Sequence, residues 1–275
     1  MKLLNKTTVY YFAAASLLVV SSSAPAAITD FNTWTQVTDP LHANFTGSID
    51  TATQISLLAT GGPVPSSTDI GYQSVNSTTA ATSTTGFAFD PSDNFQVAVD
   101  FSLNFQNAPD GGLAIGFGIG EDIDGENSAG AIVFTQDGAT SFLGAAARVN
   151  DVNQSAQLVQ LGGPAAASLF AAYNAATGDV TLGFGTVGAA SPSSTATYPG
   201  IQNSWDNELL LASFFLRSDN FLGQSWTSGN AAATFSNFRV LAGTPIAVPE
   251  PNGLAFFALG SFVLAHRRQF MQRKW

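Results

Sequence analysis

The sequence predicts an all-β protein, a jelly-roll β-sandwich flanked by an N-terminal signal helix and a short C-terminal transmembrane helix. Bulky apolar content is carried mainly by Val and by 22 Phe residues, which favour strands over helices. Apolar residues in the middle of the chain recur with a period of two. No stretch between residues 27 and 245 shows a capped helical period of 3.6, so many short strands must form the fold.

The strongest strand signal is at 95–105, where apolar side chains occupy every second position for eleven residues. A second alternating run follows at 113–119, and the turn sequence at 107–112 between them predicts a hairpin. Further strands are expected at 34–37, 55–59, 86–89, 131–135, 142–149, 157–161, 169–173, 180–184, 209–217 and 234–241. Many short strands without helices indicate two packed sheets. Two long segments, 61–85 and 188–207, are expected to be loops, either disordered or at the rim of a binding face.

The charges are unevenly distributed along the chain. Between residues 27 and 248 the only cations are Arg148, Arg217 and Arg239, whereas the same span holds 18 of the 19 acidic residues, a net charge of −15. Such a domain repels nucleic acid and anionic lipid, so neither is expected as its partner. The chain has no cysteine, and His42 is the only histidine of the domain. Disulfides, thiolate chemistry and a histidine metal cluster are therefore excluded there.

Residues 1–26 read as a secretory signal peptide. Lys2 and Lys6 precede an apolar run at 9–20, and Ala24-Pro25-Ala26 places small residues at the cleavage positions. We expect export of the protein and cleavage after Ala26.

The C-terminal residues 246–275 read as a separate tail. The motif at 248–251 is Val-Pro-Glu-Pro, an apolar segment follows at 253–265, and residues 266–275 are basic. Thirteen helical residues rise only about 20 Å, which is short of the roughly 30 Å of a bilayer core. The basic end is expected to stay on the cytoplasmic side, with the domain outside.

This tail resembles the PEP-CTERM sorting signal of bacteria, in which a Pro-Glu-Pro motif, a short apolar helix and an Arg-rich end are recognised together. The residues that carry the resemblance are Pro249, Glu250, Pro251, Arg267 and Arg268. The resemblance implies an exosortase-type membrane enzyme as partner and at least a transient stay at the inner membrane. It also implies that the mature protein goes to the cell envelope or the extracellular matrix.

The segment 27–245 resembles the concanavalin A-like lectin and glucanase fold. The resemblance rests on 113–120 leading into the acidic segment 121–127, on the hairpin at 171–178, and on the closing run 235–240. It implies a fold rather than an activity.

The acidic segment holds Glu121, Asp122, Asp124 and Glu126. If it were a strand, residues 122, 124 and 126 would share a face and resemble the Glu-x-Asp-x-Glu catalytic strand of laminarinase-type glucanases. Asp122 then stands where that pattern has a nucleophilic Glu, and Gly125 favours a turn over a strand. Catalysis by Asp122, Asp124 and Glu126 is thus an alternative, and no catalytic residue is expected on the main interpretation.

A second alternative for the same segment is a calcium loop. Asp122, Asp124 and Asn127 resemble a DxDG-type turn that supplies hard oxygen ligands, although Val133 stands where an EF-hand has its bidentate Glu. A solvated acidic loop without cofactor is the third interpretation of these residues. For Trp34, Trp205 and Trp226 the interpretations are burial in the core or stacking on sugar rings.

From these patterns we expect an exported, non-enzymatic protein of the envelope or matrix that binds carbohydrate, such as an extracellular polysaccharide, or another surface. The alternatives are a carbohydrate-active hydrolase that uses the 121–126 carboxylates and a purely structural or adhesive surface protein. The identity of the ligand and the oligomeric state stay open.

Overall fold

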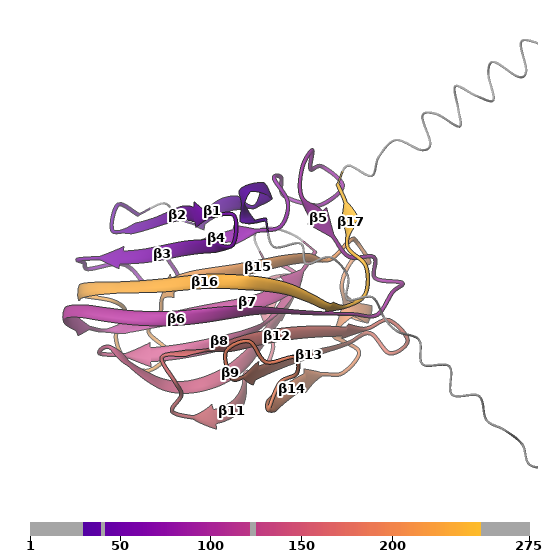
Figure 1. Cartoon of the computed structure of the whole chain (residues 1–275). Coiled ribbons are helices and arrows are strands. Elements are labelled where there is room, and N and C mark those ends of the chain that lie inside the picture. Colours follow the sequence, from indigo (N-terminus) through magenta and orange to yellow (C-terminus); the bar gives the residue numbers. More distant parts are fainter. Residues whose placement is uncertain (1–29, 40–41, 122–124, 249–275) are drawn as a thin grey trace, which may run out of the picture.

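The computed structural model describes residues 30–39, 42–121 and 125–248, and within them the chain forms a two-layer β-sandwich (Figure 1). Sheet A contains, in spatial order, β1 (Thr35–Asp39), β4 (Asp69–Gln73), β15 (Leu211–Ser218), β7 (Gly112–Gly120), β8 (Ser128–Gln136), β9 (Ala139–Val149) and β10 (Val152–Asn153), and β11 (Gln157–Leu161) also pairs with β9. Sheet B contains, in order, β14 (Ser194–Tyr198), β13 (Asp179–Gly185), β12 (Ala166–Asn174), β6 (Phe95–Asp110), β16 (Ser228–Ala242), β3 (Gln54–Thr60) and β2 (Phe45–Thr51). All pairs within the two sheets are antiparallel, so the predicted all-β sandwich is confirmed.

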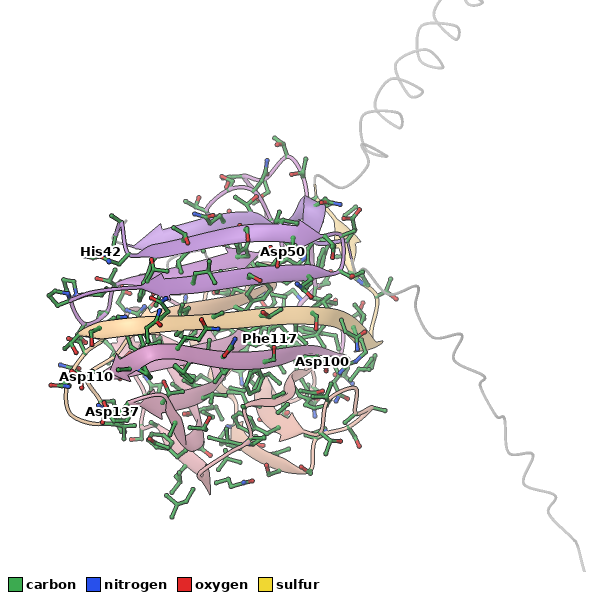
Figure 2. The ribbon with its side chains drawn as sticks, turned by 60° about the vertical axis from the view of Figure 1, so that its left-hand side comes forward. His42, Asp50, Asp100, Asp110, Phe117 and Asp137 are labelled. Atoms are coloured by element: carbon green, nitrogen blue, oxygen red, sulfur yellow. The ribbon has the colours of Figure 1, made fainter. Side chains whose placement is uncertain are left out.

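The core lies between the two sheets because alternate side chains of each strand point inward. Phe214 of β15 stacks on Phe235 of β16 with ring centroids 4.3 Å apart, which joins the sheets directly. Figure 2 shows Phe117 in the interior, whereas Asp50, Asp110 and Asp137 lie at the periphery. The exposed acidic residues thus lie outside the aromatic core, some on strands and some, like Asp137, in turns.

Helix is almost absent from the described residues. Two short 3₁₀ turns occur, η1 (Phe31–Thr33) and η2 (Ile201–Ser204). No helix in 30–39, 42–121 or 125–248 has the length and hydropathy needed to cross a bilayer. The signal peptide and the tail from Pro249 onward lie outside the described residues, so the structure leaves those predictions as they stand.

Two segments that the sequence predicted to be loops, 61–85 and 188–207, contain strands. β4 lies within 61–85 and β14 lies within 188–207, so the expectation that these segments are loops throughout is wrong. β4 has the sequence Asp-Ile-Gly-Tyr-Gln, and its two apolar side chains are too few to mark it as a strand. β4 pairs on both sides, with β1 and with β15, and this pairing stabilises the strand. The edge strand β2 was also not expected.

The last described residues are fixed to the sandwich. β17 (Ile246–Ala247) pairs with β5 (Phe87–Ala88), and the Val248 N–H donates to the carbonyl of Gly86 at 3.0 Å. Val248 is buried in a small apolar cluster that includes Leu211 of sheet A.

Candidate active-site groove

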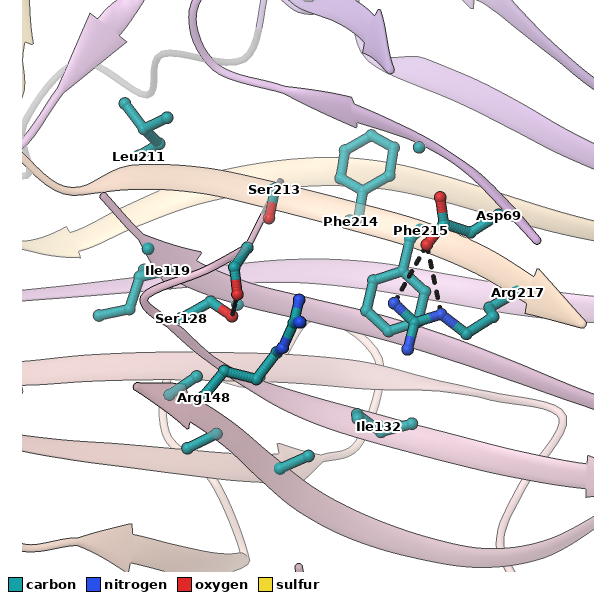
Figure 3. Close-up of a pocket in the computed structure, with 18 of the residues that line it drawn as sticks. Asp69, Ile119, Ser128, Ile132, Arg148, Leu211, Ser213, Phe214, Phe215 and Arg217 are labelled. Carbon is teal, nitrogen blue, oxygen red and sulfur yellow. Dashed lines mark hydrogen bonds and ion pairs between the residues drawn. The ribbon is translucent and has the colours of Figure 1, made fainter. Parts of the chain in front are cut away.

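The outer face of sheet A has a floor made largely of glycine. Outward-facing positions at its centre carry Gly71, Gly118, Gly120 and Gly130, all of which line a hollow. Where a strand has no side chain, its backbone forms the bottom of a depression. A hollow of about 170 Å³ lies there, and 18 of the residues that line it are drawn in Figure 3.

The register of the strands makes this hollow a groove that crosses them. Ser213 pairs with Gly118, Gly118 with Gly130, and Gly130 with Ala146, which gives one row of small residues. The lining reaches from Val37 on β1 to Asn153 on β10. Those strands span about 29 Å, since neighbouring strands lie about 4.8 Å apart. The groove is therefore long and shallow rather than a closed cavity.

Two walls flank the row of small residues. On one side lie Phe215 and Ile132, one step further along their strands. On the other side lie Leu211, Ser128 and Arg148, next to the connection between β7 and β8. The first wall is apolar and the second is mostly polar.

Two of the three arginines between residues 27 and 248 line this groove. Arg217 donates from Nε and Nη2 to Oδ2 of Asp69, at 3.2 and 3.1 Å, and its guanidinium lies 5.1 Å from the centroid of the Phe215 ring (Figure 3). Arg148 donates from Nη2 to Oδ1 of Asp151 at 2.6 Å. In a domain so rich in acids, the concentration of guanidinium groups here gives the groove a charge pattern unlike the rest of the surface.

The part of the acidic segment that includes Gly125 lies beside the polar wall of this groove. β7 ends at Gly120 and β8 begins at Ser128, so the segment is the connection of a hairpin, and its described residues are not in a strand. The catalytic interpretation assumed that residues 122, 124 and 126 lie in a strand and so share a face. Glu126 is not in a strand, so this assumption is wrong for that residue. Gly125 lines the groove, and Ser128 Oγ donates to its carbonyl at 2.8 Å.

The residues predicted from the acidic segment separate into two groups. Glu126 is exposed beside the groove, whereas Asn127 is buried. Asp122 and Asp124 lie outside the described residues. The structure therefore leaves the catalytic role of Asp122, Asp124 and Glu126 a prediction.

Glu121 is set apart from them by burial, since it is only 2 % exposed. Its Oε2 accepts the N–H of Asp206 at 2.7 Å, its Oε1 accepts the N–H of Glu208 at 2.8 Å, and Asn127 Nδ2 donates at 3.2 Å. Burial raises the pKa of this carboxyl above its usual range, and the hydrogen bonds offset that effect only in part. Glu121 ties the 206–208 loop to the end of β7 and does not face the groove.

The calcium interpretation gains no support from the described residues. Oδ1 of Asn127 accepts the N–H of Asn150 at 2.9 Å, so this proposed ligand oxygen already has a partner. Within 30–39, 42–121 and 125–248, no three His, Cys, Asp or Glu side chains are grouped as a metal site would require. A calcium loop that uses Asp122 and Asp124 remains a prediction.

The tryptophans belong to the core. Trp34, Trp205 and Trp226 are 4, 6 and 0 % exposed, so burial rather than sugar stacking is the correct interpretation. His42 sits in a peripheral turn, where its Nδ1 accepts the N–H of Asn44 at 3.3 Å (Figure 2).

Sequence reasoning missed the groove itself. Asp69, Arg148 and Arg217 lie far apart in the chain, and only strand pairing brings them to one face. The one sequence feature that could have pointed to the groove was the scarcity of cations. With only three arginines among 18 acidic residues between 27 and 248, each arginine was a candidate for a specific role.

The two sheets and their strand order define a jelly-roll sandwich of the concanavalin A-like type. No protein-family model matches the chain, and no curated protein matches it. Among solved structures, an alginate lyase from Klebsiella pneumoniae is similar over 80 % of this chain and 99 % of its own, with a TM-score of 0.50 and 8 % identity. A Bacillus licheniformis β-glucanase (TM-score 0.47, 12 % identity, 79 % of this chain and 95 % of that one) and peanut lectin (0.38, 11 %, 74 % and 91 %) are also similar.

These comparisons confirm the expected fold and correct one prediction. At 8 % identity the likeness to the alginate lyase shows the fold alone. The alginate lyase, which has this fold, is itself an enzyme. The prediction that the chain is not an enzyme is corrected accordingly, because a solved structure of this fold is that of an enzyme, the alginate lyase.

Proposed function

We propose that this chain is an exported carbohydrate-active hydrolase that binds a polysaccharide across sheet A and cleaves it with carboxylates of the 121–126 segment. The observation that carries the proposal is the groove on sheet A, whose floor is lined by small residues and whose polar wall lies beside the acidic segment.

The shape of the groove suits a linear polymer. The lining of the hollow comes from seven neighbouring strands, which suits a polymer that lies across the sheet better than a compact metabolite. Phe215 and Ile132 offer apolar contact to ring faces, and Arg148 and Arg217 offer donors to hydroxyl or carboxylate groups. A groove that crosses the whole sheet supports binding within a chain rather than at its end.

The acidic segment supplies the groups that glycoside hydrolysis requires. One carboxylic acid protonates the leaving oxygen, and one carboxylate either attacks the anomeric carbon or activates water. Glu126 is exposed beside the groove, and Asp122 and Asp124 are its neighbours in sequence. We assign the acid and the base to this set.

The termini support the remaining part of the proposal. Residues 1–26 direct export, and the tail, with Pro249, Glu250, Pro251, Arg267 and Arg268, is read by an exosortase-type enzyme at the inner membrane. The domain then works in the cell envelope or the extracellular matrix, where polysaccharide is present.

The test is a panel of neutral and uronate-containing polysaccharides incubated with the full-length protein. Binding is measured by calorimetry, new reducing ends show cleavage, and absorbance of unsaturated products separates elimination from hydrolysis. Glu126→Gln should lower the rate about 10²- to 10⁴-fold if Glu126 is the acid or base. Asp122→Asn and Asp124→Asn are tested alongside it.

Two further variants link the result to the groove. Ala146→Trp places a bulky ring on the floor and should abolish binding, since Ala146 is half-exposed there. Leu161→Ala, at a residue 78 % exposed on β11 that does not line the groove, is the matched control and should change nothing. Absence of binding and cleavage across the panel would overturn the proposal, and so would full activity in Ala146→Trp.

A further inference from the structure

A cluster of three phenylalanines stands on the outer face of sheet A beyond the groove. Phe134 of β8 stacks on Phe142 of β9, its cross-strand partner, with centroids 4.5 Å apart and planes 26° apart. Phe221, from the loop between β15 and β16, packs on both, at 5.3 Å from Phe134 and 5.7 Å from Phe142. These three rings are called the aromatic platform.

The platform exposes apolar surface that folding alone would hide. Phe221 is 63 % exposed, and the neighbouring Leu222 is 37 % exposed. In the described part of the chain, Phe221 is the one aromatic residue among the exposed large hydrophobic side chains. Because an aromatic ring gains stability when it is removed from water, an exposed ring that is packed on two others is suited to contact with a ligand.

The loop that carries Phe221 is fixed to the sheet. The Phe221 N–H donates to Oδ1 of Asp219 at 2.8 Å, and the Asp219 N–H donates to the carbonyl of Gly112 at 3.1 Å. On the other side of the loop, Gln224 Nε2 donates to Oδ1 of Asp110 at 2.8 Å. The ring is therefore held in place before any ligand arrives, which lowers the entropy lost on binding.

The platform is continuous with the apolar wall of the groove. Phe134 follows Ile132 by two residues on β8, and Phe142, Phe215 and Ala146 all pack against the cluster formed by Ile132 and Phe134. Ile132 and Phe215 line the groove itself. An apolar strip thus leads out of the groove, from the row of Phe215 to the row of Phe134 and on to Phe221.

We infer that the aromatic platform is a second sugar-binding subsite, which takes pyranose rings of a polysaccharide that extends beyond the groove; this inference rests on the proposed function. A pyranose ring carries C–H groups on its faces and hydroxyls on its edge, so an open aromatic surface takes the face and leaves the hydroxyls in water. No ionisable side chain belongs to the platform, so its own rings discriminate by shape and apolar contact.

The experiment compares oligosaccharides of increasing length, prepared from the polysaccharide that the full-length protein binds. Phe221→Ala should weaken binding of the longest oligomers about tenfold, and oligomers that fill only the groove should bind as they do to the wild type. Phe221→Trp keeps an aromatic face, so it should retain the affinity for long oligomers, and its fluorescence should shift on binding. Val187→Ala, at a side chain that is 58 % exposed between β13 and β14 of sheet B, is the control and should bind all lengths like the wild type.

The outcomes separate this inference from the proposed function. If the wild type binds no polysaccharide, the proposed function fails and the subsite falls with it. If long oligomers bind Phe221→Ala as tightly as the wild type, the groove stands and the platform is not a subsite. If the wild type sediments as a dimer that Phe221→Ala converts to a monomer, the platform is a self-association surface and the inference is wrong.

Discussion

The ring of Phe215 in β15 occupies the space above Gly116, its cross-strand partner in β7. A Cβ atom at residue 116 would overlap the ring atoms Cε1 and Cζ of Phe215. The glycine therefore allows the ring to lie against the sheet, where it forms one wall of the groove.

Gly116→Ala is expected to displace the Phe215 ring and to deform this wall. Overpacking of this kind costs about 1–3 kcal/mol in the free energy of unfolding. Polysaccharide binding should weaken by more than this loss explains, because the site itself changes shape. Thermal unfolding and calorimetry measure the two effects. The double variant Gly116→Ala, Phe215→Leu removes the clash and should regain stability but not affinity; a double variant that binds like the wild type would show that the ring is irrelevant.

The buried ion pair on sheet B predicts acid sensitivity. Oδ2 of Asp100 accepts Arg239 Nη1 at 3.0 Å and Asn237 Nδ2 at 2.7 Å. Burial alone would raise the pKa of Asp100, but the hydrogen bonds from Arg239, Ser168, Asn237 and the Gly188 N–H hold it below the usual 3.8. Because the pKa is lowered in the folded state, the stabilisation is complete above about pH 4 and is lost as the pH falls through the folded value.

Asp100→Asn should accordingly destabilise the protein by about 3 kcal/mol at pH 7, since it leaves the mostly buried Arg239 without its counter-ion. The difference from the wild type should begin to shrink as the pH drops below 3.8 and should vanish below the lower pKa of folded Asp100, where the wild-type carboxyl is also neutral. Denaturant unfolding at several pH values measures it. A difference that is constant with pH would contradict this account of the pair.

Glu121 is expected to control the order of the 206–208 loop. Glu121→Ala leaves the N–H groups of Asp206 and Glu208 without their acceptor, at a cost of about 1–3 kcal/mol for each group that stays buried. Amide hydrogen exchange should accelerate at Asp206 and Glu208 and stay unchanged at the centre of β15. If both amides exchange at the wild-type rate, the carboxylate does not hold the loop.

Calcium binding by Asp122 and Asp124 has a simple thermal test. A ligand that binds only the folded state stabilises it by about 2.7 kcal/mol at a hundredfold excess over Kd. If the loop binds calcium, millimolar calcium should raise Tm, a chelator should reverse the rise, and Asp124→Ala should abolish it. A Tm that responds to neither calcium nor chelator leaves the segment an acidic loop without metal.

The sorting tail makes the sharpest prediction about export. Proline fixes φ near −65° and disfavours helix in the residue before it, so Glu250 between two prolines is suited to recognition in an extended form. Glu250→Gln should accumulate an unprocessed, membrane-bound protein of higher mass, whereas removal of residues 253–275 should release the domain. Intact mass in the native host is the measurement. A mature protein that still ends at Trp275 in both the envelope and the medium would exclude processing of the tail.

Local pattern predicted the sheets well where strands are long and alternate cleanly. The runs at 95–105 and 113–119 correspond to β6 and β7, and 157–161 has the same bounds as β11. The strands that escaped prediction, such as β4 and β14, are short and rich in polar or small residues. Their pairing partners, and not their own sequences, determine their conformation.

The groove could not be predicted because it depends on register between distant strands. That Gly118, Gly130 and Ser213 form one row follows only from the pairing of three strands. The glycines were visible in the sequence, yet a glycine within an alternating run gives no indication of the face it leaves open. The composition of the acidic segment and the rarity of Arg148 are visible in the sequence, whereas their proximity follows only from the pairing of Ser128 with Arg148.

The pairing of β17 with β5 has a geometric consequence for the precursor. Val248 is packed against the sandwich, and the apolar segment begins at Gly253, so the chain between them spans at most about 18 Å. If residues 253–265 are held in a membrane, the linker is short enough to restrict the rotation of the domain relative to the bilayer. Leu211, which shares the apolar cluster of Val248, also lines the acidic-segment side of the groove. The tethered protein would thus hold the polar wall of the groove toward the bilayer and the aromatic platform, beyond the opposite wall, away from it, and cleavage of the tail would release the groove from that orientation.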